Sequence, residues 1–345
     1  MISKTIENAY GGALRRLAGR ARAGAEGAGV AMSVAFIFPG QGSQSVGMGK
    51  ALANAYPAAA SVLAEIDAAL GDHLTTIMWE GPAEKLTLTE NAQPALVAVS
   101  LAAMRVLQQE AGLDLAREAR FVAGHSVGEY AALAAAGAIS VADAARLVRT
   151  RGRAMAQAVA PGRGAMAALI GVDFAAAAAI AGEAAQGQVC QAANDNGGGQ
   201  VVISGDKAAV ERAVQIAKDK GVRRAMMLPV SGPFHSALMQ PAAEVMREAL
   251  AGVAIKQPCV PLVANVLAAA TADPQEIAHA LVAQVTGTVR WRESVAFMAA
   301  AGVGTFYEVG AGKVLSGLVK RIAEDASAVT IGTPEEVLAF KAARG

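Results

Sequence analysis

The chain is poor in the residues on which disulfide-bonded and metal-binding proteins depend. Its 345 residues include two cysteines, Cys190 and Cys259, which lie far apart and outside any C-x-x-C or Cys–His pattern. Disulfide frameworks and structural metal sites need clustered cysteines or histidines. We therefore expect two buried free thiols, no bound metal and a cytoplasmic location.

Net charge and long apolar runs are also missing. The 30 lysines and arginines are balanced by 29 acidic residues, which leaves +1 and no electrostatic reason to expect nucleic acid or an anionic membrane as partner. The uncharged stretch 258–272 contains Pro261 and Asn265 and is too short to cross a bilayer. We predict no transmembrane helix. Hydrophobic residues make up 54% of the chain, which is typical of a globular protein with a large core.

The first 31 residues differ in composition from the rest. Four arginines stand among alanines and glycines, and the glycine-rich stretch 24–29 follows them. This composition predicts a disordered extension outside the fold, with a transit peptide as the alternative, and Met32 offers a second possible start.

Beyond Met32, the order of strand and helix patterns indicates an α/β protein. The first patterns are strand 33–38, helix 46–70, helix 93–110 and strand 121–123. This alternation predicts a parallel sheet covered by helices. The next patterns are strand 165–171, helix 173–185, strands 189–193 and 200–204, helix 206–220 and strand 223–228. Their β-α-β-β-α-β order is ferredoxin-like. We predict an inserted subdomain at 162–229 within a catalytic domain formed by 32–161 and 230–345.

A Gly-x-Ser-x-Gly motif carries the clearest chemical signal. Gly124-His125-Ser126-Val127-Gly128 follows the predicted strand 121–123 and leads into a helical run at 129–138. Strand, tight turn and helix form the context of a nucleophile elbow, which would present the Ser126 hydroxyl and the Val127 amide to the same space. Without those flanks the motif is weak, and an ordinary structural turn is the alternative.

A serine hydroxyl needs a base within hydrogen-bond reach, and the chain has four histidines. His125 adjoins the serine, so its side chain should point away from it. His73 and His279 lie in helical or polar contexts that favour solvated side chains. His235 lies in the turn-rich stretch 231–236, just after the predicted insertion, where loops often carry functional residues. Position alone leaves two roles open for His235, a catalytic base and a helix cap.

Two further segments offer groups that bind anions. Residues 38–44, Phe-Pro-Gly-Gln-Gly-Ser-Gln, follow the first strand, and the amide or side chain of Gln41 could stabilise an oxyanion there. A phosphate loop is disfavoured because the Gly-Lys-Ser/Thr signature is absent, also at 310–314. The helical pattern 140–160 carries four arginines, and an arginine fork pairs well with a carboxylate. Periodicity does not choose among them; they are Arg146, Arg149, Arg151 and Arg153.

Five motifs taken together resemble the malonyl-CoA:acyl carrier protein transacylase family, from Ser33 to about Ile331. They are Gly40-Gln41-Gly42-Ser43-Gln44, Gly124-His125-Ser126-Val127-Gly128-Glu129, Arg151-Gly152, Gly232-Pro233-Phe234-His235 and Glu308-Val309-Gly310. The resemblance implies an α/β-hydrolase-like core with a parallel sheet and an inserted ferredoxin-like subdomain. Ala311 departs from the family pattern, in which proline often follows the glycine.

The resemblance also implies a reaction and a set of roles. Ser126 would take a malonyl group from malonyl-CoA and pass it to the pantetheine thiol of acyl carrier protein, with His235 as the base. No cofactor is implied, since the CoA thioester is a substrate. The remaining roles fall on the amides of Gln41 and Val127 as oxyanion hole, Arg151 as the partner of the malonyl carboxylate, Phe234 as a barrier to branched acyl chains, and the main-chain carbonyl of Gln284 as the group that orients His235.

Acyl carrier protein is acidic, so a local basic surface should receive it. Arg223 and Arg224 are the first candidates, followed by Lys313 and Lys320. A free-standing acyltransferase that serves a polyketide synthase fits the same residues. A serine hydrolase is less favoured, because ordinary ester hydrolysis does not need an arginine for a free carboxylate. An inert carrier-binding module is disfavoured because nucleophile, base and oxyanion positions are all present.

Overall fold

The computed structural model describes residues 33–230 and 232–344. The extension predicted at 1–31 lies outside these residues. From Ser33 onward the chain forms one compact unit. None of its described helices is both long and apolar enough to cross a membrane.

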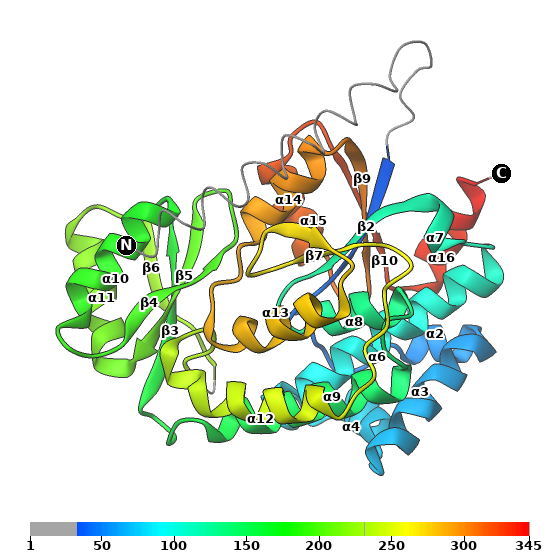
Figure 1. Ribbon diagram of the computed structural model, residues 1–345, viewed down its shortest axis with the longest axis horizontal. Helices are drawn as coiled ribbons and strands as arrows, with labels where there is room; N and C mark the ends of the chain where they lie inside the picture. The colour runs from blue at the N-terminus through cyan, green and yellow to red at the C-terminus, as the bar shows by residue number, and fades with distance from the viewer. Residues whose placement is uncertain (1–32, 231, 345) are drawn as a thin grey trace. The chain divides into compact units, whose positions relative to one another are not determined.

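A six-stranded sheet with the order β10-β9-β1-β2-β7-β8 forms the larger part of the unit's framework. Figure 1 shows its strands β2, β7, β9 and β10 surrounded by helices. Its neighbours pair in parallel except β7 with β8. The strands are β1 (Ser33–Phe38), β2 (Ala119–Gly124), β7 (Leu262–Ala264), β8 (Ala269–Thr271), β9 (Val303–Val309) and β10 (Ser327–Ile331). The carboxyl ends of β1 and β2 lie side by side, because Phe38 pairs with Gly124. The Gln41 loop and the Gly-x-Ser-x-Gly motif therefore meet at one edge of the sheet, where ligands bind in such folds.

Helices cover both faces of this sheet. Phe36 and Phe38 point into the core shared with α3, α6 and α9, whereas Ala35 and Ile37 point to the opposite face and pack with α14 and α15. A strand buried on both faces has an uninterrupted apolar sequence, as β1 has. The helices around the sheet are α2 (Lys50–Ala55), α3 (Pro57–Leu70), α4 (Leu74–Glu80), α5 (Ala83–Thr87), α6 (Thr89–Glu110), α7 (Leu115–Glu118), α8 (Gly128–Ala135), α9 (Val141–Gln157), η1 (Ala237–Met239), α12 (Gln240–Ala251), α13 (Pro274–Thr286), α14 (Trp291–Ala300), α15 (Val314–Ile322) and α16 (Pro334–Ala342).

Proline explains two differences from the expected helices. The single helix predicted over 46–70 is wrong: it begins only at Lys50 and divides into α2 and α3, because Tyr56 is extended and Pro57 starts the next helix. In contrast, α6 begins four residues before the predicted Gln93 and carries Pro94 inside it. A proline leaves the carbonyl four residues earlier without its N–H donor. Here that carbonyl belongs to Glu90, and Arg149 Nη1 donates to it at 2.9 Å.

A second, four-stranded sheet is antiparallel throughout, in the order β4-β5-β3-β6. Its elements are β3 (Gly164–Ile170), α10 (Phe174–Ala185), β4 (Cys190–Asp195), β5 (Gln200–Asp206), α11 (Lys207–Asp219) and β6 (Arg224–Met227). Figure 1 shows α10 and α11 on the side of this sheet turned away from the six-stranded sheet, and they enclose a hydrophobic cluster of their own. The predicted fold class, with a ferredoxin-like β-α-β-β-α-β unit, is confirmed. The domain boundaries at 162 and 229 stay a prediction.

The two cysteines are both free, but they are not both buried. Cys190 is buried on β4, and burial raises the pKa of its thiol to about 11. Cys259 is exposed in the connection between α12 and β7, so the expectation of two buried thiols is wrong. A cysteine in a surface loop has no sheet or helix face against which to pack.

Candidate active site

The Gly-x-Ser-x-Gly motif forms the tight turn between β2 and α8. Ser126 has a φ of 52°, in the left-handed region that residues with a side chain rarely adopt. A Cβ on Gly124 would lie 1.9 Å from the carbonyl carbon of Gly128, and one on Gly128 would lie 2.2 Å from the carbonyl oxygen of Phe38. Both glycines are therefore required by close backbone approach. Strained serines of this kind mark functional turns.

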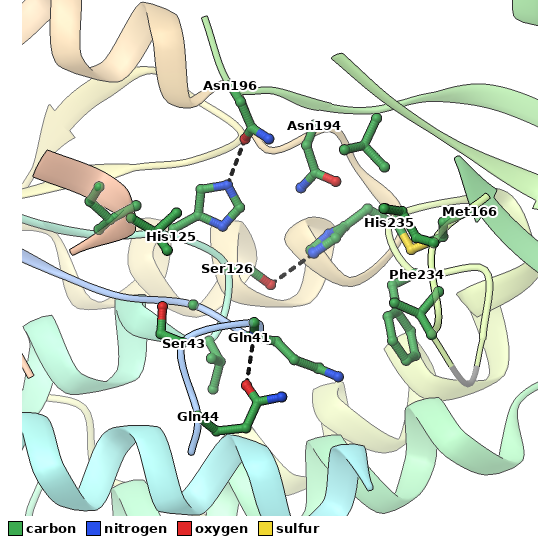
Figure 2. Close-up of a pocket in the computed structure, with 18 of the residues that line it drawn as sticks. Gln41, Ser43, Gln44, His125, Ser126, Met166, Asn194, Asn196, Phe234 and His235 are labelled. Atoms are coloured by element: carbon green, nitrogen blue, oxygen red, sulfur yellow. Dashed lines mark hydrogen bonds between the residues drawn. The ribbon is translucent and has the colours of Figure 1, made fainter. Parts of the chain in front are cut away.

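The structure brings Ser126 and His235 together, although 109 residues separate them in the chain. Ser126 Oγ lies 2.8 Å from His235 Nε2. A dashed line in Figure 2 marks this hydrogen bond. His235 Nδ1 lies 2.8 Å from the main-chain oxygen of Gln284. A carbonyl oxygen only accepts, so Nδ1 carries the proton and Nε2 accepts from the serine hydroxyl. The third member of this arrangement is a backbone carbonyl and not a carboxylate.

The imidazole of His235 is 4% exposed. Burial first, and then the charge of Arg151, lower its pKa to about 3, and the hydrogen bond to the Gln284 carbonyl only partly offsets them. The ring is consequently neutral at physiological pH and able to accept a proton.

The remaining histidines do not touch Ser126 Oγ. The ring of His125 turns toward Asn196, with Nε2 at 2.9 Å from Oδ1, and packs against Trp291 at 5.7 Å between centroids. It still lines the same cavity as Ser126, and burial lowers its pKa. His73 and His279 are exposed. Among the four histidines, His235 alone is placed to act on the serine.

The two positions expected to form an oxyanion hole line the same cavity as Ser126. Gln41 follows β1 and lies near Ser126 in Figure 2, and Val127 comes directly after the serine at the start of α8. Thr89 Oγ1 donates to the side-chain oxygen of Gln41 at 2.9 Å, so that side chain is already engaged. Neither main-chain N–H donates to a protein group in the described part of the chain. Two free amides beside a serine hydroxyl are suited to a developing negative charge.

Arg151 is the arginine of α9 that reaches the site. Its Nη2 donates to Ser126 Oγ at 3.0 Å and to Gln284 Oε1 at 2.8 Å, and its Nη1 donates to Gln93 Oε1 at 2.8 Å. The side chain is 1% exposed, and burial lowers its pKa. The buried Arg149 instead binds Glu90 and Asn91, at the start of α6, and Asp72.

Arg146 and Arg153 are exposed and form surface ion pairs. The packing of α9 thus places Arg151 alone of the four arginines beside Ser126, which periodicity did not predict.

Three buried polar residues at the site were missed by sequence reasoning. They are Gln93, Glu129 and Asn265. Burial raises the pKa of the Glu129 carboxyl to about 8. The Asn265 N–H, the Arg151 charge and the Gln284 amide lower this pKa, but by less than burial raises it. Two signals were present: Gln93 stands near the start of the uncharged helical run 91–104, and Asn265 lies within the uncharged stretch 258–272. Buried polar groups need partners, so polar residues in such stretches mark networks.

A cavity of about 640 Å³ lies between the two sheets and is lined by Gln41, Ser126, Val127, Arg151 and His235. Met166 and Val202 line it from the smaller sheet, and Phe234, which is 6% exposed, lines it beside His235. Lys313 also lines the cavity, whereas Arg223, Arg224 and Lys320 are exposed elsewhere. In the described residues no group of three His, Cys, Asp or Glu side chains could hold a metal ion.

Comparison with known proteins gives a consistent result. The acyl transferase domain family matches residues 35–336. Malonyl CoA-acyl carrier protein transacylase of Escherichia coli K12 is 48% identical over 305 residues, which are 88% of this chain and 97% of that protein. The protein of the same name from Bacillus subtilis 168 is 46% identical over 88% of this chain and 95% of its own length.

Solved structures agree in fold over the same span. Acyl-carrier-protein-S-malonyltransferase from Bartonella henselae has a TM-score of 0.89 at 55% identity and covers 90% of this chain and 99% of that one. A malonyl-transacylase in complex with its type II PKS acyl-carrier protein has a TM-score of 0.87 at 42% identity, covering 90% and 99%.

Proposed function

The chain belongs to the malonyl-CoA:acyl carrier protein transacylase family, and we propose that it transfers a malonyl group from malonyl-CoA to the phosphopantetheine thiol of acyl carrier protein through an ester on Ser126. One observation carries the proposal. His235 Nε2 and Arg151 Nη2 approach the same atom, Ser126 Oγ, at 2.8 and 3.0 Å. A base and a group that binds carboxylates therefore converge on one nucleophile.

Acylation of the serine uses the neutral His235. Its Nε2 takes the proton of Ser126 Oγ while Oγ attacks the thioester carbonyl carbon. The carbonyl oxygen gains negative charge and is received by the amides of Gln41 and Val127. When the carbonyl re-forms, the C–S bond breaks, and the CoA sulfur takes the proton from His235 Nε2.

Transfer to the carrier reverses these steps. His235 takes the proton of the pantetheine thiol, whose sulfur attacks the malonyl ester on Ser126. The Ser126 oxygen then leaves and recovers the proton from His235. The carbonyl of Gln284 holds the ring in the required tautomer throughout, through Nδ1–H. The reaction is ping-pong and needs no cofactor.

Malonyl groups differ from acetyl groups by a carboxylate, which pairs with the Arg151 fork. Arg151 Nη2 would exchange its bond to Ser126 Oγ for the carboxylate as the substrate enters. Phe234 narrows the cavity beside His235, which disfavours branched acyl chains. Lys313, which lines the cavity, is our first candidate for contact with the acidic carrier, followed by the exposed Arg223, Arg224 and Lys320.

The names of the relatives favour this reaction over a serine hydrolase, and the absence of a carboxylate behind His235 agrees with that choice. We assign the enzyme to fatty-acid synthesis in the cytoplasm. Service to a polyketide carrier is the second candidate, because one structural neighbour is a malonyl-transacylase solved with a type II PKS acyl-carrier protein.

The test is intact-protein mass spectrometry after mixing with malonyl-CoA, for the wild type and Ser126→Ala, followed by holo acyl carrier protein. We expect a malonyl adduct on the wild type alone, which the carrier then removes. Equal adducts on both proteins, or none on either, would refute the mechanism through Ser126.

A further inference from the structure

Ser126 needs an external restraint to keep its backbone in place. Its φ of 52° lies in the left-handed region, which is disfavoured for every residue with a Cβ. Such a conformation persists only where the surrounding structure holds it. The turn itself supplies one such contact, because Glu129 N donates to Ser126 O at 3.1 Å.

Two side chains from distant segments hold the Ser126 backbone as well. Asn265, which follows β7, accepts from Ser126 N with its Oδ1 at 2.8 Å. Gln284, from α13, donates to Ser126 O with its Nε2 at 3.0 Å. Asn265 Nδ2 also donates to Gly124 O at 2.7 Å, so its amide spans the turn from the last residue of β2 to the serine.

One carboxyl group in turn holds Asn265 by its main chain and Gln284 by its side chain. Glu129 accepts from the main-chain N–H of Asn265 at 2.5 Å with Oε1, and from Gln284 Nε2 with Oε2. Asn265 and Gln284 are 0% exposed and Glu129 is 1% exposed. Water therefore does not compete for these bonds, and each amide has one orientation that satisfies its partners.

The orientation of Gln284 also reaches the other reacting groups. Because its Nε2 faces Ser126 O and Glu129, its Oε1 faces Arg151 Nη2 at 2.8 Å. Its main-chain oxygen accepts from His235 Nδ1 at 2.8 Å. One residue thus contacts the nucleophile's backbone, the base and the arginine.

From these contacts we propose that Asn265 is a positioning residue of the transfer reaction, and that its side chain and that of Gln284 clamp the Ser126 peptide so that Oγ stays in line with His235. The inference rests on the proposed function for the identity of the acyl donor. The clamp acts on any electrophile that Ser126 attacks, so it can be tested separately.

The test compares Asn265→Leu with Asn91→Leu as a matched control. Both are buried asparagines of similar hydrogen bonding: Asn91 Nδ2 donates to Lys85 O at 2.9 Å, and its Oδ1 accepts from Arg149 at 2.5 Å. Only Asn265 touches the serine turn. Both variants lose stability in thermal unfolding, because each leaves buried groups without partners.

Two rates are then measured on folded protein: malonylation of Ser126 by malonyl-CoA, and labelling by an uncharged fluorophosphonate. A misplacement of about 1 Å costs roughly a hundredfold in rate. We expect Asn265→Leu to lose about that factor in kcat and in labelling, with KM for malonyl-CoA changed less than about threefold. Asn91→Leu should retain both rates within the same threefold margin.

If folded Asn265→Leu is labelled and malonylated as fast as the wild type, the clamp is refuted. If Asn265→Leu does not fold, Gln284→Met replaces it, since it keeps the carbonyl that holds His235 and removes only the side-chain amide. An unchanged rate of fluorophosphonate labelling in Gln284→Met would also refute the clamp. If the wild type labels with fluorophosphonate but takes no malonyl group, the proposed function fails, and the labelling rates still decide the clamp.

Discussion

Replacing Arg151 by methionine isolates recognition of the malonyl carboxylate. Methionine keeps much of the volume within α9 but removes every donor of the guanidinium. Arg151 is 1% exposed, so a carboxylate bound to it is shielded from water. Truncating one partner of a buried, hydrogen-bonded charge pair costs about 2–5 kcal/mol. That range corresponds to a loss of roughly 30- to 5,000-fold in kcat/KM for malonyl-CoA.

The assay measures release of CoA with malonyl-CoA and with acetyl-CoA, in the presence of holo acyl carrier protein. Acetyl-CoA has no carboxylate, so its kcat/KM should fall much less, and the ratio of the two values should fall by at least about tenfold. Arg149→Met is the matched control: it removes a second buried arginine two residues away, whose partners are Glu90, Asn91 and Asp72. An unchanged malonyl-to-acetyl ratio in Arg151→Met would refute the role of this arginine.

Three further predictions concern pH, packing and thiol reactivity. Because the pKa of His235 is lowered to about 3, its neutral form persists on acidification, and the single-turnover acylation rate should stay level from pH 8 to 5. With an imidazole of ordinary pKa, the same rate would fall about 30-fold over that range. Such a fall would contradict the lowered pKa of His235. A Cβ on Gly152 would lie 2.7 Å from the backbone of α6, so Gly152→Ala should lower the free energy of unfolding in urea by about 1–3 kcal/mol. Gly182 on α10 has open space around it, so Gly182→Ala should raise that free energy by about 0.5–1 kcal/mol. Equal effects of the two substitutions would contradict a steric clash between residue 152 and α6. A thiol reagent should modify only Cys259 in the native protein and Cys190 as well after denaturation, and two fast thiols in the native state would argue against burial of Cys190.

Local patterns alone predicted the main elements of the fold. The β-α-β-β-α-β order was readable because alternating apolar residues and short polar turns are properties of neighbouring residues. The nucleophile elbow was readable for the same reason, since both glycines and the serine lie within five consecutive positions. Helix boundaries at Tyr56 and Thr89 were predicted less well, because tertiary partners such as Arg149 decide where a proline is tolerated.

Family resemblance added residues that local patterns did not reach. His235, Arg151 and the Gln284 carbonyl were named on that basis, and the structure places all three within hydrogen-bond contact of Ser126 or of its base. Composition did not separate Arg151 from Arg149, because both lie on the same amphipathic helix and both are buried.

By itself, then, the sequence determined the α/β architecture, the elbow and the number of histidines from which a base could come. Tertiary structure alone decided which arginine faces the serine, that Cys259 is exposed, and that Asn265 holds the serine turn. The contacts of Arg151 with Gln93 and of Asn265 with Ser126 join residues 58 and 139 positions apart, which meet only when parallel strands align their carboxyl ends and the helices pack around them. Contacts of that range arise from packing between elements, and no periodicity along the chain encodes them.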